Sequence, residues 1–193
     1  LDHRRNKFYD EYAKSLVSDK EIENYYNDSV YGDISTEHIL VEVDSSATDE
    51  EKEEALNLAK EIITKLNEGK TFDEVKEEYA DSITYEDLGY RSFDANLEQS
   101  YIDEMVALDN GEYSKTPIET SYGYHIVHRI DQKEKPTLED VKDSIIDVLA
   151  DKKKEANENL YYKALAHLRE EANLEFADTV MAKKYETYLD QYK

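Results

Sequence analysis

The sequence contains no cysteine and no tryptophan, and its 193 residues include only two prolines and five glycines. The absence of cysteine excludes disulfides, thiolate catalysis and zinc sites built on cysteine, but it does not identify the redox compartment. There is also no run of about 18 apolar residues, so the sequence predicts no helix that inserts into a membrane.

Positive charge is scarce relative to negative charge. Lysine and arginine number 24 against 47 aspartates and glutamates, which gives a formal net charge of −23 at pH 7. Phosphate contacts with nucleic acid and adsorption to an anionic membrane both need a cationic surface. We therefore expect no nucleic-acid partner and no binding to anionic lipid. A chain with this many charged residues can be disordered. Here the apolar residues recur at helical and strand spacing, which argues against disorder.

Helix starts are marked by capping boxes, in which a hydroxyl and a carboxylate three residues later satisfy free amides of the first turn. Ser18, Thr48 and Thr71 each open such a box, and Thr137 opens a weaker one. The apolar stripe behind Thr48 ends at Gly69, which is typical of the residue that follows a helix. The sequence therefore predicts a helix beginning at each of the four hydroxyl residues.

Strands are predicted between the helices. Residues 38–43 and 124–130 alternate between two faces and are rich in residues that favour strands. With further strands near Leu88 and Ile118, the order over residues 34–132 is strand, two helices, strand, helix, strand, strand. This order predicts an α+β domain in which helices pack on a small, mostly antiparallel, four-stranded sheet.

The segments on either side of this domain are predicted to be helical. Residues 1–33 carry two amphipathic stripes, and residues 133–193 continue as one long helix or two in line, followed by a final helix. Residues 151–155 provide no apolar support, so we expect the long helix to project there. The chain begins with LDHRR, so we expect a piece of a longer protein from which a targeting segment has been removed.

Two histidines are the first candidates for a functional site. His38 and His125 lie on predicted strands between apolar residues and could meet across the sheet, although a lone histidine in such a place is more often structural. His128 is predicted to point to the opposite face and to be solvated. Ser82 lacks the local signature of a nucleophile, and the acidic stretch 49–54 lacks the ligand spacing of a calcium loop. The residues alone indicate no metal site and a candidate histidine pair.

Five short motifs in the right order resemble the parvulin family of peptidyl-prolyl cis-trans isomerases over residues 36–131. They are His38-Ile39-Leu40, Asp87-Leu88-Gly89, Ala107-Leu108, Asn110-Gly111-Glu112 and Tyr122-Gly123-Tyr124-His125-Ile126. The resemblance implies a parvulin-like isomerase domain at residues 34–132. It also implies rotation about X-Pro amide bonds, a reaction that needs no cofactor and no metal.

The helical flanks make the chain resemble one branch of the family, the PrsA-type foldases. These are lipid-anchored on the outer face of the Gram-positive membrane and assist the folding of secreted proteins; the periplasmic parvulin chaperones of Gram-negative bacteria are the second choice. By this resemblance residues 1–33 are the remnant of an N-terminal chaperone domain, and residues 133–193 are a C-terminal helical extension. The implied partners are unfolded or partly folded secreted polypeptides, and the full-length protein could form a homodimer.

The resemblance also implies roles for individual residues. His38 and His125 correspond to paired catalytic histidines that hydrogen-bond across the sheet beneath the substrate. Asp81 or Ser82 falls where the family carries a catalytic acidic or thiol residue near the amide. The residues at substrate-binding positions are Leu88, Leu97, Tyr101, Leu108 and Tyr122.

Departures from the family pattern leave a second function open. Ser82 replaces a carboxylate or thiol, Glu86 stands where glycine is common, and Tyr101 replaces a phenylalanine. We expect the Tyr101 hydroxyl either to point outward or to find water or a polar partner at the rim of the proline pocket. The alternative to an active isomerase is a parvulin domain of weak or no activity within a chaperone that holds its clients. The acidic loop at residues 44–46 speaks against phosphate-directed specificity.

Overall fold

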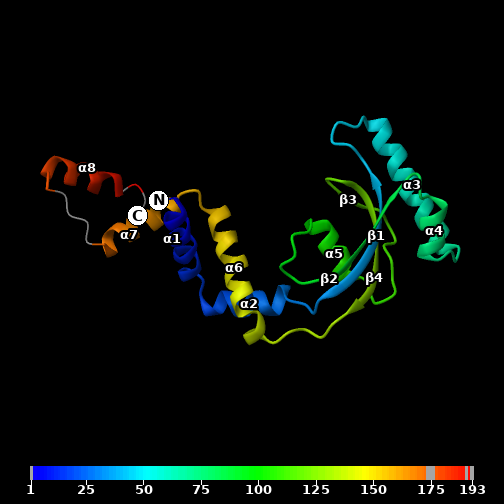
Figure 1. Cartoon of the computed structure of the whole chain (residues 1–193), viewed down its shortest axis with the longest axis horizontal. Coiled ribbons are helices and arrows are strands. Elements are labelled where there is room, and N and C mark those ends of the chain that lie inside the picture. The colour runs from blue at the N-terminus through cyan, green and yellow to red at the C-terminus, as the bar shows by residue number, and fades with distance from the viewer. Residues whose placement is uncertain (1, 173–176, 190, 192–193) are drawn as a thin grey trace. The chain divides into compact units, whose positions relative to one another are not determined.

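The computed structural model of the chain describes residues 2–172, 177–189 and 191. The fold divides into two compact units (Figure 1): residues 31–135 form the first, and the residues before 31 together with those after 135 form the second. Within the described part of the chain, none of the helices is both long enough and apolar enough to cross a membrane.

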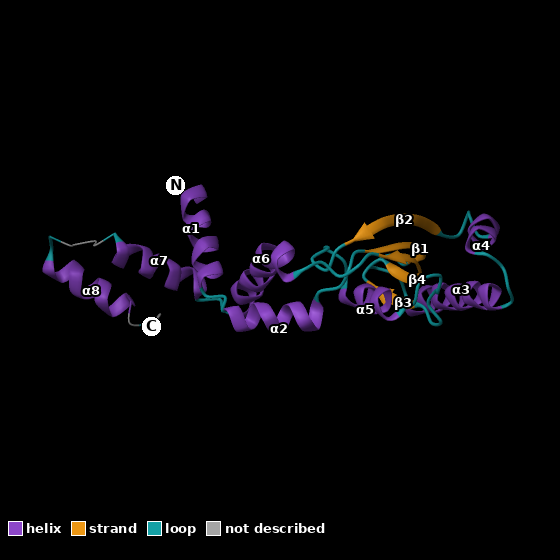
Figure 2. Ribbon diagram, turned by 90° about the horizontal axis from the view of Figure 1, so that it is seen from below, coloured by secondary structure: helices purple, strands orange, loops and turns teal. Residues whose placement is uncertain are grey.

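The first unit is built on four strands. They are β1 (Ile34–Glu42), β2 (Thr84–Arg91), β3 (Ile118–Thr120) and β4 (Gly123–Gln132). Their order in the sheet is β2-β1-β4-β3, and each neighbouring pair is antiparallel (Figure 2). The predicted α+β class with a small antiparallel four-stranded sheet is confirmed.

Helices cover both faces of this sheet (Figure 1). α3 (Asp49–Asn67) and α4 (Phe72–Glu78) cover one face, where they pack on Ile39 and Ile126. α5 (Gln99–Ala107) lies on the other face, where Met105 packs on Ile34 and Val127. Successive strand residues point to opposite faces, so β1 and β4 each contribute to both layers.

The second unit contains five helices in the described residues. They are α1 (Asp2–Ser15), α2 (Asp19–Ser29), α6 (Leu138–Ala156), α7 (Leu160–Glu171) and α8 (Thr179–Leu189). α1 packs on α6 and α7, α2 packs on α6, and the buried residues Ala13, Ala150 and Leu160 join them. Helices from before and after the first unit thus share one small core.

Residues 151–155, for which no apolar support was expected, are held to neighbouring helices by ion pairs. Lys154 Nζ lies 2.7 Å from Asp10 Oδ1 in α1, and Lys153 Nζ lies 2.5 Å from Glu21 Oε1 in α2. These partners are separated from the lysines by more than a hundred residues of sequence. The helical pattern ends at residue 156 and resumes at Leu160, so of the two predicted alternatives, one long helix or two, the structure has two helices, α6 and α7.

All four predicted capping boxes are present. The hydroxyls of Ser18, Thr48, Thr71 and Thr137 each accept a hydrogen bond from the backbone N–H three residues later, and the acidic side chain there accepts one in return. The local sequence determines these helix starts, because every group of a capping box lies within four consecutive residues.

Candidate functional site

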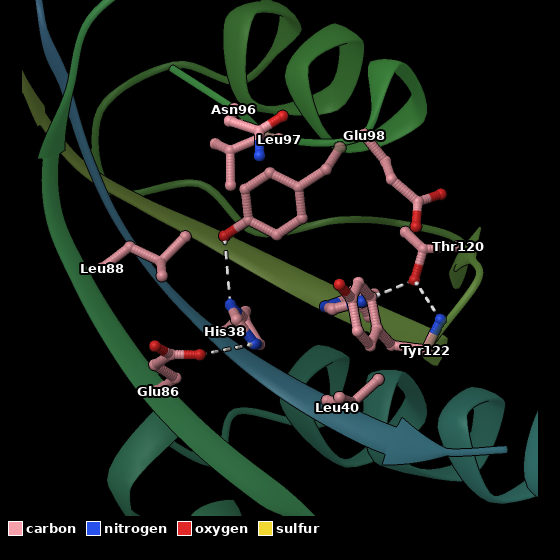
Figure 3. A pocket seen from close by; sticks show the side chains of 11 residues that line it. His38, Leu40, Glu86, Leu88, Asn96, Leu97, Glu98, Thr120 and Tyr122 are labelled. Carbon is pink, nitrogen blue, oxygen red and sulfur yellow. Dashed lines mark hydrogen bonds and ion pairs between the residues drawn. The ribbon is translucent and has the colours of Figure 1, made fainter. Parts of the chain in front are cut away.

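A pocket opens on the face of the sheet that carries α5 (Figure 3). Its volume is about 340 Å³, and we call it the histidine pocket. It is lined by His38, Leu40, Glu86, Leu88, Asn96, Leu97, Glu98, Tyr101, Thr120, Tyr122 and His125. Three leucines and two tyrosine rings supply its apolar surface, and the other six lining side chains are polar.

The register of β1 and β4 brings the two predicted histidines together. Leu40 pairs with His125 and His38 pairs with Val127, so the two histidines are diagonal neighbours on one face. Their ring centroids lie 4.7 Å apart in an edge-to-face arrangement. Only 5% of His38 and 6% of His125 is exposed to solvent.

The hydrogen bonds of the two rings go to other residues. His38 Nδ1 lies 3.2 Å from the hydroxyl of Tyr101, and His125 Nε2 lies 2.8 Å from Oγ1 of Thr120 (Figure 3). Within the described part of the chain, Nδ1 of His125 is buried and has no hydrogen-bond partner. The expected hydrogen bond between the histidines is therefore corrected: in the described part of the chain the two rings meet edge to face, and each is oriented by a hydroxyl.

Burial keeps both histidines neutral at pH 7. Desolvation lowers the pKa of His38, although the carboxylate of Glu86 opposes this effect. Desolvation, assisted by the neighbouring His38 and opposed by Glu98, lowers the pKa of His125 to about 4. Loss of solvent disfavours the charged imidazolium, so the base of the pocket is polar but uncharged.

Tyr101 lies inside the pocket wall, which corrects the expectation for its hydroxyl. The side chain comes from α5 and is 3% exposed. Its hydroxyl lies 3.2 Å from His38 Nδ1 and 3.2 Å from Thr36 Oγ1, so it points neither outward nor to the rim. Burial raises the pKa of Tyr101 to about 12, and the hydroxyl keeps its proton at neutral pH.

Asp81 and Ser82 lie away from the pocket. Both are exposed in the turn between α4 and β2, and neither lines the pocket. Glu86 lies beside His38 instead, because β2 begins at Thr84 and its register sets Glu86 opposite His38. Glu86 Oε2 lies 4.0 Å from Nε2 of His38. The only sequence signal for Glu86 is that it replaces a common glycine.

The remaining predicted binding residues divide into two groups. Leu88, Leu97 and Tyr122 line the pocket, whereas Leu108 is buried in the core beneath α5. Besides Glu86, sequence reasoning missed four of the lining residues: Leu40, Asn96, Glu98 and Thr120. Period-two alternation from His38 places Leu40 on the same face, whereas the other three depend on how distant segments meet.

His128 points to the opposite face, as expected, but its side chain is 23% exposed rather than fully solvated. Its ring lies against Phe72, with centroids 5.0 Å apart, and its Nδ1 lies 2.7 Å from Oε1 of Glu37. A neighbouring carboxylate and an aromatic ring therefore cover it. Among the described residues there is no group of three or more histidine, aspartate or glutamate side chains arranged to hold a metal ion.

Comparison with known proteins agrees with this geometry. Residues 38–131 match the family model of the rotamase, or PPIC-type PPIase, domain. The foldase protein PrsA of Exiguobacterium sibiricum is 34% identical over 162 residues, which cover 79% of this chain and 48% of that protein. Foldase protein PrsA 1 of Lactobacillus johnsonii is 27% identical over 165 residues, covering 83% and 50%. The chain thus spans about half the length of the curated relatives it matches.

Solved structures show the same fold. The foldase protein PrsA of Lactococcus lactis superposes with a TM-score of 0.58 at 17% identity, covering 95% of this chain and 65% of that one. The peptidylprolyl isomerase PrsA of Bacillus cereus superposes with a TM-score of 0.55 at 24% identity, covering 89% and 60%. At this identity the likeness concerns the fold alone.

Proposed function

Because the chain belongs, through residues 38–131, to the PPIC-type peptidyl-prolyl isomerases of the parvulin family, we propose that it accelerates cis-trans isomerisation of X-Pro bonds. Its substrates would be unfolded or partly folded secreted polypeptides. The observation that carries the proposal is the histidine pocket, in which apolar side chains surround two buried, neutral histidines.

The reaction is a rotation, so the site needs no nucleophile. The barrier of about 18–20 kcal/mol arises from the partial double bond of the amide. A site lowers it by binding the twisted amide more tightly than either planar isomer. Each tenfold of rate corresponds to about 1.36 kcal/mol, so a few well-placed contacts suffice. An apolar slot for the proline ring and a water-poor environment around the amide meet this need.

We assign the slot to three side chains. Leu88, Leu97 and the ring of Tyr101 offer apolar surface to the pyrrolidine ring. His38 and His125 form the uncharged base of the pocket, and the hydroxyls of Tyr101 and Thr120 fix their ring orientation. Because both imidazole rings are uncharged, the polarity of the pocket stays low. A region of low polarity favours the twisted amide, in which the resonance of the planar amide is lost.

We assign the acidic position beside the amide to Glu86 rather than to Asp81 or Ser82. Glu86 lines the pocket and lies 4.0 Å from His38, whereas the other two are exposed in a turn. This assignment removes the main argument for a silent domain, since the substitution at Ser82 no longer leaves the pocket without an acid. The family match also favours an active isomerase over the alternative, a domain of weak or no activity within a holding chaperone.

We further propose an extracytoplasmic location with a lipid anchor outside this chain. The resemblance of residues 38–131 and of the flanking helices to foldases named PrsA supports it. On this proposal the second unit, which joins α1 and α2 to α6 and α7, belongs to a larger chaperone module. A homodimer of the full-length protein is part of the same proposal.

A proline-limited refolding assay tests the function. The chain should raise the rate of the slow refolding phase of a client protein, and His125→Ala should reduce that rate at least tenfold. His167→Ala is the matched control, because His167 is exposed on α7. Circular dichroism should show that both variants fold. If the wild-type chain leaves the slow phase unchanged yet suppresses aggregation of the client, the holding function replaces the isomerase.

A further inference from the structure

A second hollow adjoins the histidine pocket. It is an open recess of about 390 Å³, lined by Leu40, Glu42, Val43, Asp44, Ser45, Ser121 and Tyr122. Leu40 and Tyr122 line both hollows, so one apolar wall continues from the pocket into the recess. A polypeptide whose proline occupies the pocket therefore has a path along β1 into what we call the acidic recess.

Negative charge is the only charge along this path in the described residues. Glu86 and Glu98 line the histidine pocket, and Glu42 and Asp44 line the acidic recess. Neither hollow is lined by a lysine or an arginine among these residues. Lys52 lines a third hollow, which continues beyond Asp44 along the β3–β4 turn. Since both pocket histidines are neutral at pH 7, no cation offsets the carboxylates inside the two hollows.

Hydrogen bonds hold the recess carboxylates in place. Asp44 Oδ1 accepts a bond of 2.8 Å from the backbone N–H of Ser46 and one of 2.6 Å from its hydroxyl. These bonds lower the pKa of Asp44, so it stays ionised at neutral pH. Glu42 accepts a bond from the hydroxyl of Thr84. An ionised carboxylate has about four acceptor positions, so capacity remains for an ammonium or guanidinium group.

One side chain that lines the histidine pocket has a buried polar atom without a partner. His125 is 94% buried, since 6% of its surface is exposed, and its Nδ1 has no hydrogen-bond partner among the described residues. Buried polar atoms are nearly always paired. The protein's own hydrogen bonds therefore leave one of the two pocket histidines incomplete.

The geometry of β1 sets which client residues reach the carboxylates. His38, Leu40 and Glu42 alternate onto one face, and a strand rises about 3.3 Å per residue. Glu42 therefore lies about 13 Å along the strand from His38, a span that an extended client covers in about four residues. Glu86, at 4.0 Å from His38, lies beside the proline position itself.

On the basis of the proposed isomerase function, we propose that the two hollows select X-Pro segments that carry lysine or arginine within about four residues of the proline. Glu86 recognises a cationic side chain next to the proline. Glu42 and Asp44 recognise one further along the client. The same arrangement disfavours acidic and phosphorylated segments, because the hollows contain no cation in the described residues that would offset their charge.

Two sets of three peptides test this specificity, and each peptide contains one X-Pro bond. In one set lysine, alanine or glutamate occupies the position before proline, and in the other set it occupies the position about four residues from proline, with alanine at the position that is not varied. We expect kcat/KM to fall in the order lysine, alanine, glutamate, with the lysine peptide about fivefold or more above the glutamate peptide at low salt. The ratio should shrink in 0.5 M NaCl, because salt screens exposed charges.

Matched variants separate the recess from the net charge of the chain. Glu42→Gln with Asp44→Asn should reduce the lysine-to-glutamate ratio at the distant position, and Glu86→Gln should reduce it next to the proline. The control is Glu53→Gln with Glu54→Gln, two exposed residues of α3 that line neither hollow. This control removes the same number of negative charges as the recess double variant. It should leave the lysine-to-glutamate ratio as in the wild type.

The outcomes distinguish this inference from the function on which it rests. Equal turnover of the three peptides in both sets, or an equal loss of preference in the Glu53 and Glu54 control, overturns the specificity and leaves the isomerase standing. If no peptide is turned over, the isomerase fails. Fluorescence anisotropy, with the same peptides carrying a fluorescent label, then decides the specificity. Tighter binding of the lysine peptide than of the glutamate peptide supports the specificity, and equal binding overturns it.

Discussion

Tyr101 and His38 are joined by a buried contact between two elements, with the tyrosine hydroxyl 3.2 Å from Nδ1 of the imidazole. The same hydroxyl lies 3.2 Å from Oγ1 of Thr36, so one side chain of α5 is tied to two neighbouring positions on one face of β1. The hydroxyl that distinguishes Tyr101 from the phenylalanine expected at this position is therefore part of the hydrogen bonding inside the pocket.

This contact makes Tyr101→Phe destabilising. Loss of the hydroxyl leaves His38 Nδ1 and Thr36 Oγ1 buried without a partner, which should lower the free energy of unfolding by about 1–3 kcal/mol. Isomerase activity should fall too, since His38 loses the group that orients it. Urea unfolding of Tyr101→Phe, Thr36→Val and the double variant measures the coupling. Additive effects in this cycle would show that the two hydroxyls do not interact.

The lowered pKa of His125 predicts a measurable pH dependence. An NMR titration of the ring should give a midpoint near pH 4, well below the usual 6.5. Between these values the unfolded chain binds a proton that the folded chain does not, so the free energy of unfolding should decrease as the pH falls from about 6.5 to about 4. His125→Gln should flatten this part of the profile. A midpoint near 6.5 would mean that water reaches the ring.

A charge in the proline slot should abolish activity. Leu97 lines the histidine pocket and packs on the core beneath α5, so Leu97→Asp places a carboxylate where the neutral pyrrolidine ring would bind. We expect at least a hundredfold loss of kcat/KM for every X-Pro peptide. Ile130→Asp is the control, because Ile130 is 43% exposed and lies outside the pocket. Equal losses in both variants would place proline elsewhere.

The turn before His125 depends on a glycine. Gly123 has φ of +132°, and a Cβ on it would lie 2.2 Å from the carbonyl oxygen of Val41 on β1. Gly123→Ala should therefore shift the β1–β4 register beside the pocket and lower the melting temperature. Gly111→Ala is the comparison, because Gly111 also has positive φ but free space around it. There we expect only the backbone strain of about 1–2 kcal/mol.

The sheet and the helices on its two faces should fold without the rest of the chain. Residues 31–135 contain both apolar layers of the sheet, around Ile39 on one face and Ile34 on the other. A fragment of these residues should give the circular dichroism of a folded α+β domain and a cooperative melting transition. An unfolded spectrum would show that the domain boundary predicted at residues 34–132 is misplaced.

Local sequence accounts for the parts of this protein whose interactions are short in range. The four capping boxes and the alternation of β1 and β4 are encoded within a few residues of each position. The same alternation puts His38 and His125 on strands with a defined face, which is why they were identifiable as a pair. Their motifs also sufficed to indicate the family.

Only the tertiary structure decided which groups surround that pair. The register of β2 sets Glu86 opposite His38, and the packing of α5 turns the Tyr101 hydroxyl inward. The support of Lys153 and Lys154 likewise comes from helices near the start of the chain. Each of these contacts joins residues tens of positions apart or more. Their geometry depends on strand register and helix packing, which no local pattern of residues specifies.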